Sequence, residues 1–557
     1  QDGQTCYDFY WRYWRPFGEV LTDMEREGIR VDAANKLRAA ERRAEMERDR
    51  LELKFRTWAA SYCPAAWFMN PGSGTQVAAL LFGGAPNPRT KEHTPIRRTF
   101  YIEREEYEEL LVARDGLPVS SEHMYGFKLD RRTAERHVNT ARGGRGHVGG
   151  AAPADNKVKP GIKKVEFEIE SIGLNVPRIT KLGNPSTDGA SLVELSGRPF
   201  DDPPVYGSAY QQFGGGAAGA RACEAIAALV AVGAIDTMLS NFILPLQEYA
   251  DAESRVHCSL NLNTETGRLS SRRPNLQNQP ALEKDQYKIR EAFCAEKGNA
   301  LVVADYGQLE LRLLAHMTDC QSMIAAFKSG GCFHSRTAMG MFDHVRAAVE
   351  RGDVLLEWDY SKGEPPAPLL KDVFGSERRK AKTLNFSIAY GKTIHGLSKD
   401  WGVSTTEAKA MLDAWYADRP EVRSWQRDTI KTAHKEGWSR TLMGRYRILP
   451  GIKDGNRAVV AHLERAAINT PIQGGAADIM TLAMLKIRKS DRLKELGYRL
   501  LLQIHDEVIL EGPKEHALAA KEEVVACMQN PFDEALPSLK VDLVVDAKTA
   551  ANWFEAK

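Results

Sequence analysis

Two short apolar runs in the sequence each end in acidic residues. Residues 301–304 lead into Asp305, and residues 500–504 lead into His505, Asp506 and Glu507. Short apolar runs bounded by polar residues are typical of buried strands. The second run, with the apolar residues 508–510 beyond the acids, predicts a hairpin with an Asp–Glu pair at its turn. Both patterns place carboxylates at the ends of buried strands, and the periodicity of residues 309–317 predicts a helix after the first.

The pairing of Asp506 with Glu507 predicts a bound cation. Like charges side by side repel each other and desolvate poorly, so they require a counter-charge. Oxygen ligands without a cluster of His or Cys favour Mg2+, which binds through one or two carboxylates plus phosphate oxygens. Two such ions about 4 Å apart activate a 3′-hydroxyl and stabilise a leaving pyrophosphate. Asp305 alone would more often be a turn residue or a helix cap, so only the two sites together predict this chemistry.

A cationic stripe is the third chemical pattern. Arg378, Lys382, Phe386 and Tyr390 are spaced by four residues, so on a helix they form one gently drifting line of side chains. Two cations suit a triphosphate, and two rings offer a surface for a base. Lys382 is also placed to donate a proton to a departing pyrophosphate. The alternative is an ordinary amphipathic helix whose basic residues are solvated. The aromatic residues on the same face as the charges argue against this alternative.

The composition describes the kind of protein that carries these sites. A chain of 557 residues is too long for one ordinary core, so we expect several domains or one large split domain. Hydrophobic residues at 43% and charged residues at 27% are typical of a soluble globular protein. No uninterrupted apolar stretch approaches the ~20 residues of a bilayer span, which argues against contact with a membrane.

Charge and cysteine usage narrow the function classes further. The net charge is only +2, so an enzyme that acts on nucleic acid must concentrate positive charge in a cleft or stripe. The eight cysteines include no CxxC pair, which argues against a zinc knuckle or a disulfide framework and favours a reducing compartment. The chain starts at Gln1 without Met or a signal, and we expect that processing or fragmentation removed any targeting segment.

Regular patterning is interrupted three times. Helices are predicted near residues 33–58 and 75–82, but the regular pattern is lost over 84–173. That segment contains a Gly-rich run at 142–146 and a basic cluster of Lys157, Lys159, Lys163 and Lys164, and we expect a mobile or partly disordered insertion there. Residues 199–219 and 346–370 are similarly rich in Gly or Pro. Plain surface loops and loops that contact nucleic acid remain equal alternatives for all three segments. Regular patterning returns near residue 257 and continues to the end.

Five motifs resemble those of family A DNA polymerases (DNA polymerase I-like) and follow the order of that family. They are TGRLSSRRPNLQNQP at 266–280, DYGQLELR at 305–312, RRKAKTLNFSIAYG at 378–391, ERAAINTPIQGGAADI at 464–479 and QIHDEV at 503–508. Two positions depart from the family pattern: Gly307 stands where Ser is more common, and Cys332 where an acidic residue often precedes the Phe/Ile-His pair. The three insertions and the opening FYWRYWRPFGEVLTDMEREGIRVD are most similar to the plant and algal organellar branch.

The resemblance implies roles for the residues that match these motifs. Asp305, Asp506 and the Tyr306 carbonyl would hold two Mg2+ ions, for which Mn2+ can substitute, and Glu507 would assist nearby. Arg378, Lys382 and His334 would grip the triphosphate of the incoming nucleotide. Other residues of the nucleotide site would contact its sugar and base, with Glu310 excluding a ribose 2′-hydroxyl; they are Tyr306, Gln308, Glu310, Phe386 and Tyr390. Catalysis would rest on Asp305, Asp506, Glu507 and Lys382.

A further set would contact DNA near the primer end. Every base pair offers a minor-groove acceptor at purine N3 or pyrimidine O2, so pair geometry can be checked without reading sequence. The residues implied are Arg268, Asn275, Gln277, Gln473 and His505, with Arg465 and Asn469 along the same track.

The implied architecture is an α+β right hand, with an antiparallel palm sheet, helical fingers and a helical thumb. The predicted parts are an N-terminal segment on the palm (1–35), the thumb (36–256, with insertions near 84–173 and 199–219), the first palm part (257–320), the fingers (321–437, with an insertion near 346–370) and the second palm part (438–557). The fingers helix would rotate toward the palm when a correct nucleotide binds, which makes mismatches react slowly. A 3′–5′ exonuclease domain precedes this region in the family branch, and no proofreading is expected of these residues.

The resemblance predicts an enzyme, a DNA-directed DNA polymerase of plastid or mitochondrion that acts in replication and repair as a monomer. Its partners would be primer-template DNA, dNTPs and replication proteins such as a helicase or single-strand binding protein. A single-subunit RNA polymerase is the nearest rival, against which Glu310 and the 266–280 motif argue. A silent accessory subunit would lack a carboxylate, whereas Asp305 and Asp506 are both present. A nuclease would degrade strands without nucleotides, and no acidic cluster with DxE-type spacing lies near the start.

Overall fold

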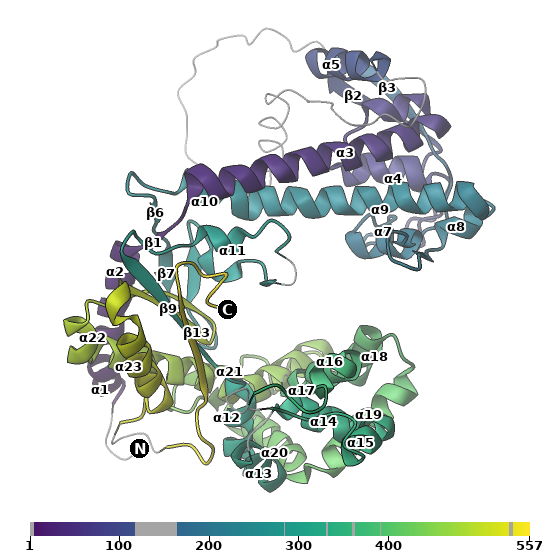
Figure 1. Cartoon of the computed structure of the whole chain (residues 1–557). Coiled ribbons are helices and arrows are strands. Elements are labelled where there is room, and N and C mark those ends of the chain that lie inside the picture. The colour runs from purple at the N-terminus through teal and green to yellow at the C-terminus, as the bar shows by residue number, and fades with distance from the viewer. Residues whose placement is uncertain are drawn as a thin grey trace. The chain divides into compact units, whose positions relative to one another are not determined.

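The computed structural model describes residues 5–116, 164–282, 285–329, 332–358, 363–389, 391–533 and 538–557. The chain divides into two compact units (Figure 1). The first combines Gln1–Ala33 with Tyr249–Lys557, and the second is Ala34–Glu248. The second unit is thus inserted into the first. The five motifs, at residues 266–508, all belong to the first unit.

Helices dominate the inserted unit. Its elements are α3 (Arg38–Tyr62), α4 (Gly74–Phe82), β2 (Arg97–Glu103), α5 (Arg104–Asp115), β3 (Lys164–Glu170), α7 (Gly189–Ser196), β4 (Gly197–Arg198), β5 (Val205–Tyr206), α8 (Ala209–Gln212), α9 (Gly216–Met238) and α10 (Leu244–Glu248). The long helices α3 and α9 lie side by side (Figure 1). Their facing sides bury a core with Phe55, Leu80, Ile169 and Ile226 at its centre, and this burial is the main term that holds the unit together.

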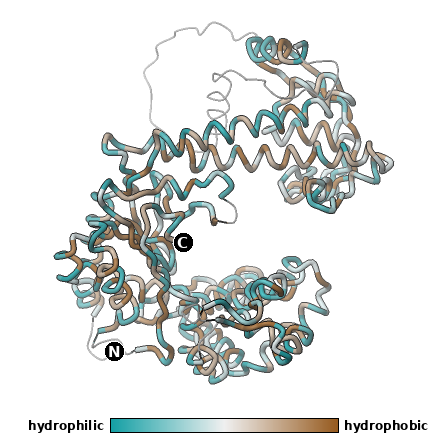
Figure 2. The backbone as a smooth tube through the Cα atoms, viewed as in Figure 1, coloured by the Kyte–Doolittle hydropathy of each residue, from teal (hydrophilic) through white to brown (hydrophobic). Residues whose placement is uncertain are grey.

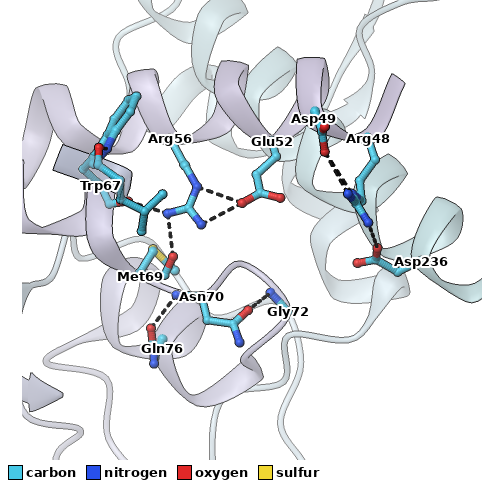
Figure 3. Close-up of polar contacts among 11 residues, drawn as sticks. Arg48, Asp49, Glu52, Arg56, Trp67, Met69, Asn70, Gly72, Gln76 and Asp236 are labelled. Carbon is cyan, nitrogen blue, oxygen red and sulfur yellow. Dashed lines mark hydrogen bonds and ion pairs between the residues drawn. The ribbon is translucent and has the colours of Figure 1, made fainter. Parts of the chain in front are cut away.

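Two largely buried arginines of α3 have partners that balance their charge. The buried Arg56 of α3 forms an ion pair with Glu52 at 2.6 Å and donates to the carbonyl oxygens of Trp67 and Met69 (Figure 3). Arg48 similarly pairs with Asp49 at 2.9 Å and approaches Asp236 of α9 (Figure 3). Buried charges are stable only with such partners, so these contacts fix α3 against the chain that follows it.

Residues Gly216–Glu248 form a helical segment that is long and apolar enough to span a membrane by length and composition alone. Apolar residues follow α9 along its length (Figure 2). Nine residues of α9 are buried, however, and several of them belong to the core of the unit. We therefore read α9 as the core helix of a folded domain; Glu224 and Asp236 interrupt its apolar run in the sequence.

The prediction of irregular chain over 84–173 is wrong for the described part of that segment. Strands β2 and β3 pair antiparallel, with Phe100 opposite Phe167, and α5 follows β2. The alternation of Val165, Phe167 and Ile169 was a strand signal that the neighbouring basic cluster concealed. The Gly-rich run at 142–146 and three lysines of the basic cluster, Lys157, Lys159 and Lys163, lie outside the described residues, whereas Lys164 begins β3.

The other two irregular segments also contain regular structure. Residues 199–219 include β5, α8 and the first turn of α9, and 346–370 includes the end of α15 and a bridge between Leu355 and Leu369. Short elements of this kind lack the repeated apolar pattern on which sequence prediction depends.

The first unit contains the remaining elements. Before the first acidic motif they are α1 (Cys6–Phe9), α2 (Arg15–Glu27), β1 (Ile29–Arg30), β6 (Arg255–Val256), β7 (Ser259–Asn261), β8 (Ser270–Arg272) and α11 (Ile289–Ala292). From that motif onward they are β9 (Asn299–Tyr306), α12 (Leu309–Thr318), α13 (Gln321–Lys328), α14 (Phe333–Met341), α15 (Asp343–Glu350), α16 (Leu370–Val373), α17 (Gly375–Ala389), α18 (Ile394–Trp401), α19 (Thr405–Ala417), α20 (Pro420–Glu436), β10 (Trp438–Arg440), β11 (Tyr446–Ile448), α21 (Arg457–Lys489), α22 (Asp491–Glu495), β12 (Arg499–Ile504), β13 (Glu507–Pro513), α23 (Ala517–Gln529) and β14 (Val545–Ala550).

A four-stranded antiparallel sheet with the order β12-β13-β9-β14 forms the centre of this unit. Helices α2, α21 and α23 pack with the sheet and bury a core that includes Phe17, Val302, Leu485 and Val524. A second cluster, built from α12 to α20, has Phe333, Leu384 and Trp415 among its buried residues. The predicted strand before Asp305, the helix after it and the acidic hairpin are all confirmed.

Candidate active site

The sheet brings the predicted acidic residues together. Asp305 near the end of β9 is the register partner of Glu507 at the start of β13. The backbone N–H of Tyr306 donates to the carbonyl of Asp506 at 3.0 Å. His505 adopts a φ of +54°, which allows the tight β12–β13 turn that presents Asp506. Two segments remote in the sequence thus meet at one end of the two central strands, and we call the end formed by Asp305, Asp506 and Glu507 the acidic edge.

The carboxyl group of Asp506 is poorly compensated by the protein. Burial raises its pKa to about 7, Arg268 opposes this effect, and the nearby Glu310 and Asp305 add to it. Its Oδ1 atom is buried and accepts no hydrogen bond from the described residues. The nearest cation, the Arg268 guanidinium, lies 3.9 Å from Oδ1. Burial also raises the pKa of Asp305.

These groups fit a hard divalent cation. An orphaned carboxylate oxygen beside a second carboxylate needs a counter-charge, and Mg2+ takes one or two carboxylates and leaves its other positions to water or phosphate. Within the described ranges, no group of three or more His, Cys, Asp and Glu residues forms a ligand set of its own. A cation at Asp305 and Asp506 would therefore need oxygens from a backbone carbonyl, water or substrate.

Glu507 differs from the two aspartates because its oxygens already have partners. The indole Nε1 of Trp553 donates to its Oε1 at 2.8 Å, and the ammonium of Lys557 contacts its Oε2. The side chain is only 3% exposed. Neither Trp553 nor Lys557 was expected from the sequence, where nothing links them to a residue so remote.

The first turn of α12 places further predicted residues beside the acidic edge. Arg268 donates to Glu310, whose side chain is buried. Gln308 precedes α12 with a φ of +57°, and its Oε1 is buried without a hydrogen bond from any described group. The Tyr306 hydroxyl donates to the Met528 carbonyl at 2.6 Å in the core. The side chain of Tyr306 is thus committed to the fold, which leaves its backbone for any role at the site.

Helix α17 carries Arg378, Lys382 and Phe386 at the predicted spacing, and His334 of α14 joins them with its ring 5.7 Å from that of Phe386. Lys382 is exposed, and Arg378 is half-buried. Tyr390, the fourth member of the predicted stripe, lies outside the described residues. The structure therefore brings three of the four stripe residues and His334 together on neighbouring helices.

The hydrogen bonds of His334 define its protonation. The indole N–H of Trp415 donates to Asn385 Oδ1 at 2.9 Å, so Asn385 Nδ2 must be the donor toward His334 Nδ1, 3.0 Å away. An accepting Nδ1 means a neutral ring with its proton on Nε2. Burial, with Arg378 and Lys382 nearby, lowers the pKa of His334 to about 4. No sequence pattern indicated Asn385 or Trp415 as partners of His334.

Cys332 contacts the cationic stripe directly. The Arg378 Nη2 atom donates to its Sγ at 3.1 Å. Burial raises the pKa of the Cys332 thiol, but contacts with Ser335 and Arg378 outweigh burial and lower it overall. The thiol thus occupies the position at which family members often have an acidic residue, and it contacts Arg378 there.

The predicted DNA contacts fall into two groups. Arg268, Gln277 and His505 lie near the acidic edge, where Gln277 Nε2 donates to the carbonyl and the side chain of Gln503, both at 3.1 Å. The Asn275 side chain caps the short turn Leu276–Asn278 by accepting from the Gln277 backbone at 3.0 Å. Arg465, Asn469 and Gln473 follow one line of α21, and Asn469 Oδ1 is a buried acceptor without a described donor.

Arg445 links these groups, a role that the sequence did not indicate. It pairs with the buried Asp478 of α21 at 2.7 Å and donates to the carbonyls of Thr266 and Gly474. The 266–280 segment is thereby tied to α21. No sequence pattern indicated this role, because Arg445 lies outside the five motifs.

Comparison with known proteins places this geometry in context. The model of DNA polymerase family A matches residues 220–353 and 367–555. The chain is 51% identical over 562 residues to "DNA polymerase I A, chloroplastic/mitochondrial" of Arabidopsis thaliana, with 100% of this chain and 52% of that protein covered. It is 49% identical to "DNA polymerase I B, mitochondrial" of Oryza sativa subsp. japonica, with 99% of this chain and 53% of that protein covered. The chain thus spans about half the length of the curated relatives it matches.

Among solved structures, the POL domain of Pol1 from M. smegmatis, in complex with DNA primer-template and dNTP, is similar over 98% of this chain and 70% of its own. The TM-score is 0.65 and the identity 25%. The predicted α+β right-hand fold is confirmed.

Proposed function

The chain belongs to DNA polymerase family A, and from this premise we propose that it extends the 3′ end of a DNA primer along a template with dNTPs. The observation that carries the proposal is the meeting of Asp305 with Asp506, whose buried Oδ1 lacks a hydrogen bond from the described residues. The solved relative that holds primer-template and dNTP supports the substrate class.

Asp305, Asp506 and the Tyr306 carbonyl would hold two Mg2+ ions, or Mn2+ in their place. When bound, these ions would acidify the 3′-hydroxyl and neutralise charge on the leaving pyrophosphate. The remaining work of the protein is positioning, which dominates phosphoryl transfer generally. Arg268 and the sheet hold the carboxylates in place for that task.

The α17 face would bind the triphosphate. Arg378 and Lys382 supply positive charge, and Lys382 would protonate the departing pyrophosphate. His334 would donate from Nε2 as a neutral ring, because Asn385 occupies its other nitrogen. Phe386 and Tyr390 would pack on sugar and base, with Gln308 beside them. The buried Glu310 would fill the space of a ribose 2′-hydroxyl and so select deoxynucleotides.

The predicted DNA contacts belong to the same proposal. Arg268, Asn275, Gln277, Gln473 and His505 would follow the minor groove at the primer end, and Arg465 and Asn469 would line the track on α21. Under this proposal, the unit Ala34–Glu248 corresponds to the thumb, the central sheet to the palm and helices α13–α20 to the fingers. The names of the plant relatives support a plastid or mitochondrial location. There the protein would act in DNA replication and repair as a monomer, together with a helicase or single-strand binding protein.

Extension of a labelled primer with Mg2+ and dNTPs tests the proposal. Asp305→Asn and Asp506→Asn should each lower the extension rate by at least about 10²-fold, because charge stabilisation at the reacting atoms is lost. Asp413→Asn is the matched control, because it removes the same charge from an exposed residue of α19. Its extension rate should stay within a few-fold of the parent protein.

Retained extension by Asp506→Asn, at unchanged duplex affinity, would refute the ligand role. Extension with NTPs in preference to dNTPs would instead indicate an RNA polymerase. Strand degradation without nucleotides would indicate a nuclease.

A further inference from the structure

Glu507 lies at the acidic edge beside Asp305, but its carboxylate oxygens are held by other residues of the protein. Trp553 Nε1 and the Lys557 ammonium contact its two carboxylate oxygens, one each. The same ammonium lies 3.5 Å from Asp305 Oδ2. One lysine therefore bridges a buried glutamate and a predicted metal ligand.

The position of Lys557 is fixed by the segment that follows β14. The backbone N–H of Trp553 donates to the Phe293 carbonyl at 2.9 Å, and the fully buried Trp553 ring packs edge-on against the Phe293 ring. The Arg290 guanidinium stacks over the same indole at 4.1 Å. Lys548 Nζ donates to the Lys557 carbonyl at 2.8 Å. These contacts fix the segment that carries Lys557, and this exposed residue reaches the acidic edge through its ion pairs with Glu507 and Asp305.

We propose that Lys557 is a resident counter-ion of the acidic edge, which keeps Glu507 out of the metal ligand set and weakens divalent-cation binding at Asp305 until a nucleotide arrives. The inference rests on the proposed function and deepens it. Lys557 is a positioning residue, since it acts through Glu507 and Asp305.

The charge balance at the edge supports this role. Glu507 and Lys557 cancel each other, and Arg268 pairs with Glu310 while lying 3.9 Å from Asp506. Asp305, Asp506 and Asp546, the neighbour of Asp305 on β14, carry the remaining negative charge. An ion at Asp305 would be repelled by the nearby ammonium; the two side chains are 34% and 42% exposed, so the effective dielectric is about 20, as is typical near a protein surface. Phosphate oxygens of a nucleotide would supply the missing negative charge. Metal and nucleotide should therefore bind cooperatively, with the metal weak on its own.

Binding of Mn2+ to the full chain without DNA or nucleotide tests the proposal. The free ion is followed by electron paramagnetic resonance, and Asp305→Asn defines the specific site by abolishing it. Lys557→Gln should tighten Mn2+ binding at least about threefold, because a cation is removed next to the ion, whereas Lys557→Arg should bind as the parent does. Lys489→Gln, the same change at an exposed lysine at the end of α21, should have no effect. Thermal unfolding confirms that each variant is folded.

The double variant Glu507→Gln/Lys557→Gln separates the proposal from its alternative. Removal of a self-neutralising pair should return the Mn2+ affinity to within about twofold of the parent. A direct Glu507 ligand predicts weaker binding in the double variant, which would overturn the proposal. The proposal would also be overturned if folded Lys557→Gln bound Mn2+ as the parent does or more weakly, or if Mn2+ binding survived Asp305→Asn. Because no DNA or nucleotide is present, loss of primer extension would overturn the polymerase function without changing this result.

Discussion

The imidazole of His334 is buried between α14 and α17, with its Nδ1 accepting from Asn385 and with Arg378 and Lys382 nearby. Its pKa is lowered to about 4 from an ordinary value of 6.5. Between these two pH values the unfolded chain binds a proton that the folded protein does not. The linkage relation then requires the folded state to lose stability as pH falls through this window, by up to about 3 kcal/mol.

We therefore expect His334→Gln to flatten the loss of stability between pH 6.5 and pH 4, since its amide cannot titrate. Urea unfolding across this range measures the free energy at each pH. The exposed His462 on α21 offers the same substitution as a control, and His462→Gln should retain the slope of the parent protein. Parallel curves for parent and His334→Gln would contradict the assignment of a buried neutral ring.

The sulfur of Cys332 should position Arg378 for the nucleotide. Arg378 Nη2 donates to Sγ at 3.1 Å, so Cys332→Ala removes the partner and should raise the KM for dNTP about three- to tenfold, the equivalent of about 1 kcal/mol. Cys332→Asp supplies a carboxylate and should restore the KM, with kcat nearly unchanged in both variants. Steady-state extension kinetics measure this split, and equal KM values for the two variants would rule out the pairing role.

Among single residues, the sequence could predict those whose own position or spacing in the chain indicates a function. Asp305, Asp506 and the spacing of Arg378, Lys382 and Phe386 are of this kind. Asn385, Trp415, Trp553 and Lys557 could not be found, because their contacts depend on which helices and strands pack together. The identity of each partner is a property of the tertiary structure.

Helix α21 and the hairpin formed by β10 and β11 are joined by a buried ion pair. Asp478 is 2% exposed; its Oδ1 pairs with Arg445 at 2.7 Å, and its Oδ2 accepts the Met443 N–H at 2.8 Å. Burial raises the pKa of Asp478, and Arg445 opposes this rise. Removal of one partner leaves an uncompensated charge inside the protein, which typically costs about 3 kcal/mol or more.

Asp478→Leu should accordingly lower the free energy of unfolding by about 3 kcal/mol. The double variant Arg445→Met/Asp478→Leu should recover part of this loss, because an apolar pair of similar size leaves no buried charge behind. Urea unfolding of the two variants and the parent provides the comparison. A double variant less stable than the single one would show that the hydrogen bonds of Arg445 to Thr266 and Gly474 matter more than the ion pair.

Long, strongly periodic elements were predictable from the sequence, whereas short ones were not. Strands β9, β12 and β13 and helix α12 have apolar patterns that persist over their length, and α17 carries its stripe at four-residue spacing. Strands β10 and β11 have three residues each, too few to establish a period. Strands β2 and β3 were missed although each has seven residues, because a Gly-rich and basic stretch lies between them in the chain.

The inserted unit Ala34–Glu248 leaves and re-enters the rest of the chain at neighbouring points. Within the first unit, β1 pairs with β6 through Ile29 opposite Val256, and the Val31 N–H donates to the Ser254 carbonyl at 2.8 Å. The inserted unit also has a hydrophobic core of its own. Closely spaced connections and separate cores are typical of domains that fold independently.

Replacement of residues 34–248 by a flexible Gly/Ser linker of about eight residues should therefore leave the first unit folded, since such a linker readily spans the ends of a paired strand. The variant should unfold cooperatively and still bind dNTP. Its affinity for primer-template should fall at least about tenfold, with a shallower salt dependence, because phosphate contacts of the inserted unit are lost. Fluorescence anisotropy at several salt concentrations measures both, and the same linker inserted between Ala33 and Ala34 of the full chain is the control. Unchanged DNA affinity in a folded variant would confine DNA binding to the first unit, and failure to fold would show that the acidic edge needs the inserted unit for its stability.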